Sequence, residues 1–142
     1  MHTHTRAGVA VSTLEEGLMP LNQIALQFHG RVSYHDYEGI ALDLEERDRI
    51  VADFGDQPVM ILRNHGLLTC GETVGAAFIR MYYLERACNI QLRVMATGRD
   101  IMLPSDAVCE RTAKQLTRFP LGQYEWPAIL RRVQSECPDY NR

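Results

Sequence analysis

The feature of this sequence that most constrains its fold is an unbroken apolar run, Val-Met-Ile-Leu, at residues 59–62. A run without a polar face is typical of a strand that is buried on both sides of a sheet. A turn signal, Asn64-His65-Gly66, follows it, and residues 67–70 predict a second strand. Buried strands need neighbours that hydrogen-bond their amides and carbonyls. Since few other segments have strand character, part of the sheet is expected to lie outside this chain.

Helices are predicted mainly after these two strands. The longest should run from about Thr73 to Thr97, because apolar residues recur there at every third or fourth position and Gly98 can end it. Thr73 is also a suitable N-cap. Two further helices are predicted, one opened by Ser105 and one around Trp126.

Three shorter elements are predicted before the apolar run. Residues 43–54 favour a helix that Asp43 opens and Gly55 ends. Residues 7–14 fit a buried helix or a strand, with the helix favoured, and residues 32–34 fit a short strand. The side chains that the helix at 43–54 should bury are Leu44, Ile50, Val51 and Phe54.

Composition narrows the class of protein. With 142 residues, of which 46% are hydrophobic, the chain is long enough for one domain over residues 1–142. Its net charge of −3 comes without a basic stripe, so neither nucleic acid nor a membrane is an expected partner. No apolar stretch reaches the roughly 18 to 20 residues of a membrane-spanning helix, and no signal peptide is recognisable. The dispersed cysteines are typical of reduced thiols, and a cytoplasmic location is expected.

The histidines are the candidate chemical groups. If residues 1–5 form a strand, His2 and His4 project from the same face and can bind one metal ion. His65, beside Gly66, could supply a third ligand. Three neutral imidazoles leave a coordination position open for water or substrate, as in catalytic zinc sites. The alternative is a domain whose exposed His-x-His pair is incidental, which metal analysis of the purified protein would reveal.

The two remaining histidines are interpreted differently. His29 and His35 are expected to be surface or hydrogen-bonded residues without a metal role. His35 lies in the sequence Tyr34-His-Asp-Tyr-Glu38, so a nearby carboxylate is its expected partner.

Four segments occur in an order that is informative as a set. The chain starts with His2-Thr-His4-Thr after Met1, and residues 63–71 read Arg-Asn-His-Gly-Leu-Leu-Thr-Cys-Gly. The long helix carries Tyr83-Leu-Glu-Arg-Ala87, and residues 32–39 read Val-Ser-Tyr-His-Asp-Tyr-Glu-Gly. Together these segments resemble the class II aldolase/adducin family over residues 1 to about 100, and the last of them is similar to a stretch of adducins.

The resemblance implies an α/β fold, a three-layer α/β/α sandwich around a mostly antiparallel sheet, of which residues 1–142 would be the C-terminal portion. It implies a homotetramer, and it matches His2, His4 and His65 to zinc-binding histidines, where another divalent metal could also serve. The implied activity is that of a metal-dependent aldolase, a lyase that cleaves a carbon–carbon bond through a zinc-stabilised enediolate. The implied partner is a small phosphorylated sugar or a related hydroxy-carbonyl compound.

Two other functions are compatible with the same resemblance. One is a sugar-phosphate 4-epimerase of the family, and the other is a non-catalytic, adducin-like assembly module. A module selected only for packing has no need of three imidazoles at ligand positions. Their retention therefore favours the enzyme.

The sequence also departs from the family's pattern. Family enzymes place a glycine-rich phosphate loop and an acid/base glutamate before the His-x-His motif, so these are expected upstream of Met1, and the catalytic residues are unknown. Glu85 is interpreted as structural rather than catalytic. Tyr140 is a candidate proton donor to the site of a neighbouring subunit. The chain alone is expected to bind phosphate poorly and to turn over little; ordinary enzyme rates in a retro-aldol assay would contradict this.

Overall fold

The computed structural model of the chain describes residues 1–40 and 44–141. Within these residues the chain forms four strands and six helices. In chain order they are β1 (His2–Thr3), α1 (Arg6–Ser12), α2 (Gln23–Leu26), β2 (Val32–His35), α3 (Leu44–Phe54), β3 (Val59–Leu62), β4 (Gly66–Thr69), α4 (Val74–Met95), α5 (Asp106–Leu116) and α6 (Glu125–Glu136). The predicted elements before α4 are confirmed to within two residues, whereas α2 was not predicted.

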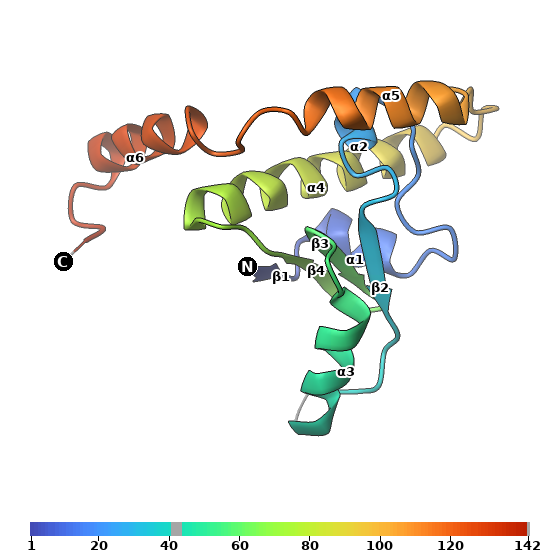
Figure 1. Ribbon diagram of the computed structural model, residues 1–142, viewed down its shortest axis with the longest axis horizontal. Coiled ribbons are helices and arrows are strands. Elements are labelled where there is room, and N and C mark those ends of the chain that lie inside the picture. Colours follow the sequence, from blue (N-terminus) through green and yellow to red (C-terminus); the bar gives the residue numbers. More distant parts are fainter. Residues whose placement is uncertain (41–43, 142) are drawn as a thin grey trace.

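The strands form one sheet with the order β1-β4-β3-β2, which lies at the centre of Figure 1. β1 pairs with β4, and β4 with β3, in the antiparallel sense, whereas β3 and β2 are parallel. The class is thus α/β with a mostly antiparallel sheet, as predicted. The pairing places His2 opposite Leu68, so the start of the chain lies beside the strand that follows His65.

One face of the sheet carries the hydrophobic core. The side chains of Val59, Ile61 and Leu67 lie on this face and are fully buried. Helices α1 and α4 cover them, and Val11 of α1 and Leu84 of α4 have no exposed surface. Burial of this apolar surface is the main favourable contribution to folding.

Helix α3 packs against the opposite face, at the edge strand β2. His35, the last residue of β2, is buried on this face and contacts α3. Met60 and Leu62 of the neighbouring β3 are buried on the same face. The sheet therefore lies between α3 and the layer of α1 and α4, as Figure 1 shows, and the three-layer α/β/α arrangement is present in partial form.

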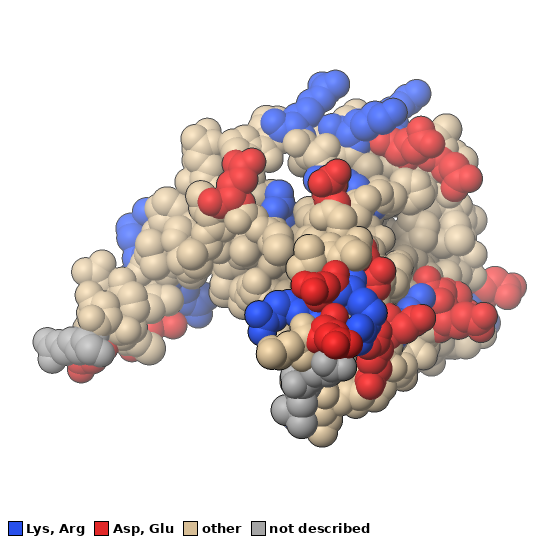
Figure 2. All heavy atoms as spheres, turned by 60° about the horizontal axis from the view of Figure 1, so that its bottom comes forward, with Lys and Arg blue, Asp and Glu red and all other residues tan. Residues whose placement is uncertain are grey.

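The side of α3 that faces the sheet is polar, contrary to the sequence-based expectation. Leu44 and Val51 are 72% and 66% exposed, so their predicted burial is wrong. Glu46 is buried in their place, and Asp53, two turns later on the same side of the helix, contacts His35. The buried imidazole explains the difference, because a polar group in the interior needs polar partners. Figure 2 shows that acidic and basic side chains also intermingle over the outer surface of α3.

The helices that follow the sheet begin where the sequence predicts. Thr73 caps α4 by accepting a hydrogen bond from the Ala76 N–H at 3.1 Å. Helix α6 buries none of its residues, and it extends with the C-terminus away from the sheet in Figure 1. Phe119, between α5 and α6, is 72% exposed. The predicted cap of α3, Asp43, lies outside the described residues. Across the described ranges, no helix combines the length and the apolar character needed to cross a membrane.

A buried amide fixes the long connection between α1 and α2. Gln91 of α4 is 1% exposed. Its amide nitrogen donates to the Gly17 carbonyl and its amide oxygen accepts from the Met19 N–H, both at 2.8 Å. A connection that has little regular structure of its own is thereby attached to the longest helix.

We expect Gln91→Leu to lower the free energy of unfolding by about 2 to 3 kcal/mol, because it leaves a carbonyl and an amide of this connection without partners. Urea denaturation followed by circular dichroism measures the change. Gln115→Leu, at an exposed position of α5, is the matched control and should change stability by less than about 0.5 kcal/mol. Equal effects of the two substitutions would contradict this role of Gln91.

Candidate metal centre

The structure brings together the three histidines that the sequence singles out. His2 lies in β1, His4 directly after it, and His65 in the turn between β3 and β4. Ring nitrogens of the three lie within 4.8 Å of one another, and the ring centroids are 4.6 to 4.8 Å apart. His2 and His4 are exposed and His65 is half-buried, so this histidine cluster is open to solvent. His29 and His35 lie outside it.

Backbone pairing with β4 holds the short strand β1. The Thr69 N–H donates to the Met1 carbonyl at 2.8 Å, next to the position of His2. Gly66 permits the close approach of the two strands, because a Cβ at this position would overlap the carbonyl oxygen of Thr3. The absence of a side chain at Gly66 therefore allows β1 to bring its histidines to the turn that carries His65.

A backbone carbonyl orients the ring of His2. Its Nδ1 lies 2.9 Å from the Leu67 carbonyl oxygen, which can only accept, so Nδ1 carries the proton. In the neutral ring Nε2 then has the free lone pair, and Nε2 lies 2.8 Å from Nε2 of His4. One ring nitrogen bonded to a carbonyl and the other turned toward the cluster is the arrangement typical of metal-binding histidines.

The turn that carries His65 is fixed by three different elements. The Arg63 N–H donates to the His35 carbonyl of β2, and the Asn64 N–H donates to the Ser12 carbonyl of α1. The His65 N–H donates to the carbonyl of Leu62, the last residue of β3, at 3.1 Å. Asn64 has a φ of 55°, a left-handed conformation that asparagine tolerates better than most residues. The position of the third imidazole is thus set by backbone contacts to β2, α1 and β3.

Glu85 of α4 supports the segment that follows His4. Its carboxylate accepts hydrogen bonds from the Thr5 hydroxyl at 2.5 Å and from the Gly8 N–H at 2.9 Å. A carboxylate at the start of α1 satisfies amides that the first turn of a helix leaves without partners. Glu85 thus has the contacts of a structural residue, as the sequence analysis interpreted it.

The surroundings of His65 favour its neutral form. Burial of the ring lowers the pKa of His65 below its usual value of 6.5, and the neighbouring His2 and His4 lower it further. A smaller opposing influence comes from Glu46, whose negative charge raises the pKa. A neutral imidazole is the form that binds a metal ion.

The donor set fits a divalent transition metal such as zinc. Three imidazole nitrogens converge from one solvent-open side, which leaves room for a further ligand, whereas structural zinc sites are usually closed by four protein ligands. Within residues 1–40 and 44–141 no carboxylate belongs to this group. Tyr140 lies beyond α6 and is half exposed, and nothing in the described ranges joins it to the histidine cluster.

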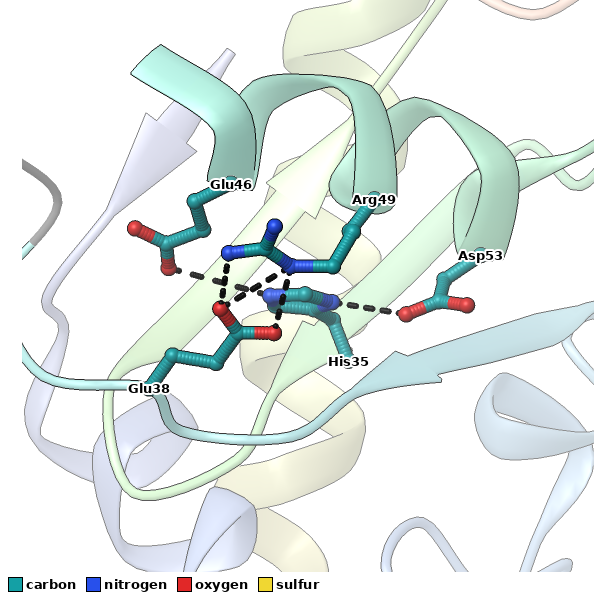
Figure 3. A network of polar contacts seen from close by, with 5 residues as sticks. All are labelled: His35, Glu38, Glu46, Arg49 and Asp53. Carbon is teal, nitrogen blue, oxygen red and sulfur yellow. Dashed lines mark hydrogen bonds and ion pairs between the residues drawn. The ribbon is translucent and has the colours of Figure 1, made fainter. Parts of the chain in front are cut away.

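Sequence reasoning missed the residues that lie next to the cluster on the α3 side. The ring of Tyr37 lies 6.5 Å from that of His65, measured between centroids. Figure 3 shows His35 between Glu46 and Asp53 of α3. The carboxylate expected beside His35 is confirmed, but it is Asp53, at 2.7 Å, rather than an acidic residue in the adjacent sequence. The predicted helix at residues 43–54 carries several acidic residues, and their spacing does not single out Asp53.

Comparison with known proteins shows the family to which the chain belongs. Residues 1–92 match the Class II Aldolase and Adducin N-terminal domain. The chain is 45% identical, over 99% of its length, to a Caulobacter vibrioides protein named "Putative aldolase class 2 protein", of which it covers 56%. It is also 47% identical to Alpha-adducin of Rattus norvegicus over 99 residues. This match covers 69% of this chain and 13% of the adducin.

Solved structures share the fold of this chain. An aldolase II superfamily protein from Pseudomonas syringae superposes with a TM-score of 0.92 at 46% identity, over 99% of this chain and 57% of that one. L-fuculose 1-phosphate aldolase from Glaciozyma antarctica PI12 gives a TM-score of 0.77 at 26% identity, over 95% of this chain and 52% of that one. The chain therefore spans about half the length of the bacterial relative and of the solved structures that it matches.

We expect Gly66→Ala to push β1 away from β4 and to disturb the cluster. The added methyl group has no space beside the Thr3 carbonyl, so the free energy of unfolding should fall by about 1 to 3 kcal/mol. The ring signals of His2 and His4 should shift in NMR spectra. Gly98→Ala is the control, since it has a positive φ but open space around it, and it should lower stability without moving those signals. Unmoved signals in Gly66→Ala would contradict the role of Gly66.

Acidification should destabilise the metal-free chain through His65. Its folded-state pKa lies below 6.5, so the unfolded chain binds the proton more readily, and stability falls as pH drops through 6.5 toward the lowered value. His65→Gln should reduce the difference in unfolding free energy between about pH 7.5 and about pH 5.5. Gln115→Leu, a substitution without a titrating group, should keep the wild-type difference. If His65→Gln also kept it, the assigned direction of the pKa shift would be wrong.

Proposed function

We propose that this chain, which belongs to the class II aldolase and adducin family, carries the metal-binding histidines of an aldolase-type lyase. The observation that carries the proposal is the convergence of His2, His4 and His65, with ring nitrogens within 4.8 Å of one another. The ion would be zinc or another divalent metal. The substrate would be a phosphorylated sugar or a related hydroxy-carbonyl compound, whose carbon–carbon bond is cleaved.

The chemistry of the donor set supports this reaction class. A divalent metal, when bound, supplies Lewis-acid stabilisation for negative charge that develops on oxygen as a carbon–carbon bond breaks. The three imidazoles of this chain would hold the ion, with Leu67 fixing the proton on Nδ1 of His2. The solvent-open side of the histidine cluster leaves access for a small molecule.

Similarity to named enzymes supports the substrate class. The structure of L-fuculose 1-phosphate aldolase, a protein named for a sugar phosphate, superposes on 95% of this chain. Since the chain spans about half of that structure, activity and substrate are proposed for a protein that contains this segment. The proposal includes assembly as a homotetramer, and it keeps sugar-phosphate 4-epimerisation as the alternative reaction.

A non-catalytic, adducin-like module is the second candidate. The observation that favours it is the 47% identity to Alpha-adducin over 99 residues. Metal binding separates the two candidates, because a module that serves only assembly does not depend on an ion at the histidine cluster.

Metal analysis of the purified chain tests the leading proposal. We expect about one zinc per chain, because the three imidazoles form one site. His4→Ala and His65→Ala should each weaken zinc binding by more than about tenfold, since each removes a ligand. Inductively coupled plasma mass spectrometry after equilibrium dialysis gives the stoichiometry.

His29→Ala, outside the histidine cluster, is the matched control and should retain the metal. Wild-type protein that stays metal-free after dialysis against zinc would remove the chemical basis of the aldolase proposal. It would leave the assembly module as the better account.

A further inference from the structure

The most unusual side chain outside the histidine cluster is His35. It is 4% exposed and lies between two carboxylates of α3 (Figure 3). Its Nδ1 lies 2.7 Å from Oδ2 of Asp53. Its Nε2 lies 3.7 Å from Oε1 of Glu46 and is buried without a hydrogen-bond partner in the described part of the chain. An apolar residue would pack here without leaving a polar atom unsatisfied, so the imidazole calls for a specific role.

A second polar contact joins the same segment to α3 three residues later. Both Nε and Nη2 of Arg49 donate to the carboxylate of Glu38, with distances of 2.5 to 3.1 Å. Paired contacts of this kind fix orientation as well as distance. His35 and Glu38 thus both attach to the same helix (Figure 3). Asp36 and Tyr37 lie between these two anchors in the sequence.

The segment held in this way lies beside the histidine cluster. The Tyr37 ring stands at 71° to the His65 ring, with centroids 6.5 Å apart. Tyr37 is 53% exposed, so its place beside the imidazole is not imposed by burial. The backbone carbonyl of His35 also accepts a hydrogen bond from the Arg63 N–H, two residues before His65, at 2.8 Å. His35 thus contacts α3 through its ring, and its backbone carbonyl contacts the turn that carries His65.

We propose that His35 is a positioning residue of the metal centre, which attaches the turn of residues 36–38 to α3 and thereby holds Tyr37 beside His65 as one wall of the site. The inference rests on the proposed metal site. The His35 ring then does more than attach α3 to the sheet. Tyr37 lies between the anchors His35 and Glu38, and next to His65. A ligand bound at the metal should then depend on Tyr37 and, through Tyr37, on His35.

Nuclear Overhauser contacts between the Tyr37 and His65 rings in the metal-free chain test the positioning, because the ring centroids lie 6.5 Å apart. His35→Leu removes both ring nitrogens and should weaken these contacts by about half or more. His35→Asn keeps a donor near the position of Nδ1 and should restore most of their intensity. His29→Asn is the matched control and should leave them unchanged. Unchanged contacts between the two rings in His35→Leu would overturn the proposal.

The consequence for the metal centre is tested with Co²⁺ as the metal and acetohydroxamate as a two-oxygen probe of the open coordination side. His35→Leu and Tyr37→Ala should each bind one Co²⁺ per chain, and each should weaken acetohydroxamate binding by about fivefold or more, followed by the visible absorption of Co²⁺. The double substitution should lose no more than the larger single loss, because His35 acts through Tyr37. Losses that multiply in the double variant, or an unchanged affinity in His35→Leu, would overturn the inference.

Two further outcomes are distinguishable from these. Should His35→Leu fail to fold, Asp53→Ala replaces it, because this side chain is 49% exposed and its truncation removes only the first anchor. It should weaken the contacts between the two rings and the binding of the probe in the same direction. Wild-type protein that binds no Co²⁺ would instead overturn the proposed function, and with it the inference, before any variant is compared.

Discussion

The antiparallel pairing of β1 with β4 is the contact on which the candidate site depends. It joins the first residues of the chain to the strand after His65, so that histidines far apart in sequence meet at one end of the sheet. The pairing needs a residue without a side chain at position 66, because the Thr3 carbonyl fills that space. It also supplies the Leu67 carbonyl that orients the ring of His2. The pairing of β1 with β4 therefore sets the strand register, the strand spacing and the orientation of the His2 ring.

The two faces of the sheet are stabilised by different kinds of interaction. On one face, α1 and α4 bury Val59, Ile61 and Leu67, and this burial is non-directional. On the other face, α3 meets the sheet through His35 and two carboxylates, whose hydrogen bonds work only at set distances and angles. A directional contact is a poorer source of stability than apolar packing but a better means of placing a neighbouring group. The histidine cluster lies on the side of the directional contacts.

Local patterns in the sequence predicted most of the fold and the three histidines, but not what depends on tertiary pairing. The apolar run at residues 59–62 and the Thr73 cap are local signals, and both strand and cap lie where expected. The buried face of α3 was predicted from its apolar residues and was wrong for Leu44 and Val51. A helix that packs on a buried imidazole turns its carboxylates inward, and no pattern within the helix reveals that the imidazole is there. For the same reason the sequence predicted that His35 has a carboxylate partner, but not that this partner is Asp53.

The histidine cluster carries a cost that bears on the choice between enzyme and assembly module. Burial lowers the pKa of His65 below its usual value of 6.5, and the neighbouring His2 and His4 lower it further. As pH falls below 6.5, the unfolded chain therefore binds a proton at residue 65 more readily than the folded chain does, which lowers stability. A side chain without a titrating group at position 65 would avoid that loss, because backbone hydrogen bonds pair β1 with β4. The Leu67 carbonyl holds the proton on Nδ1 of His2, so the free lone pair on Nε2 is turned toward His4. The acid-side loss of stability and the orientation of this lone pair both support the proposed metal site over a role in assembly alone.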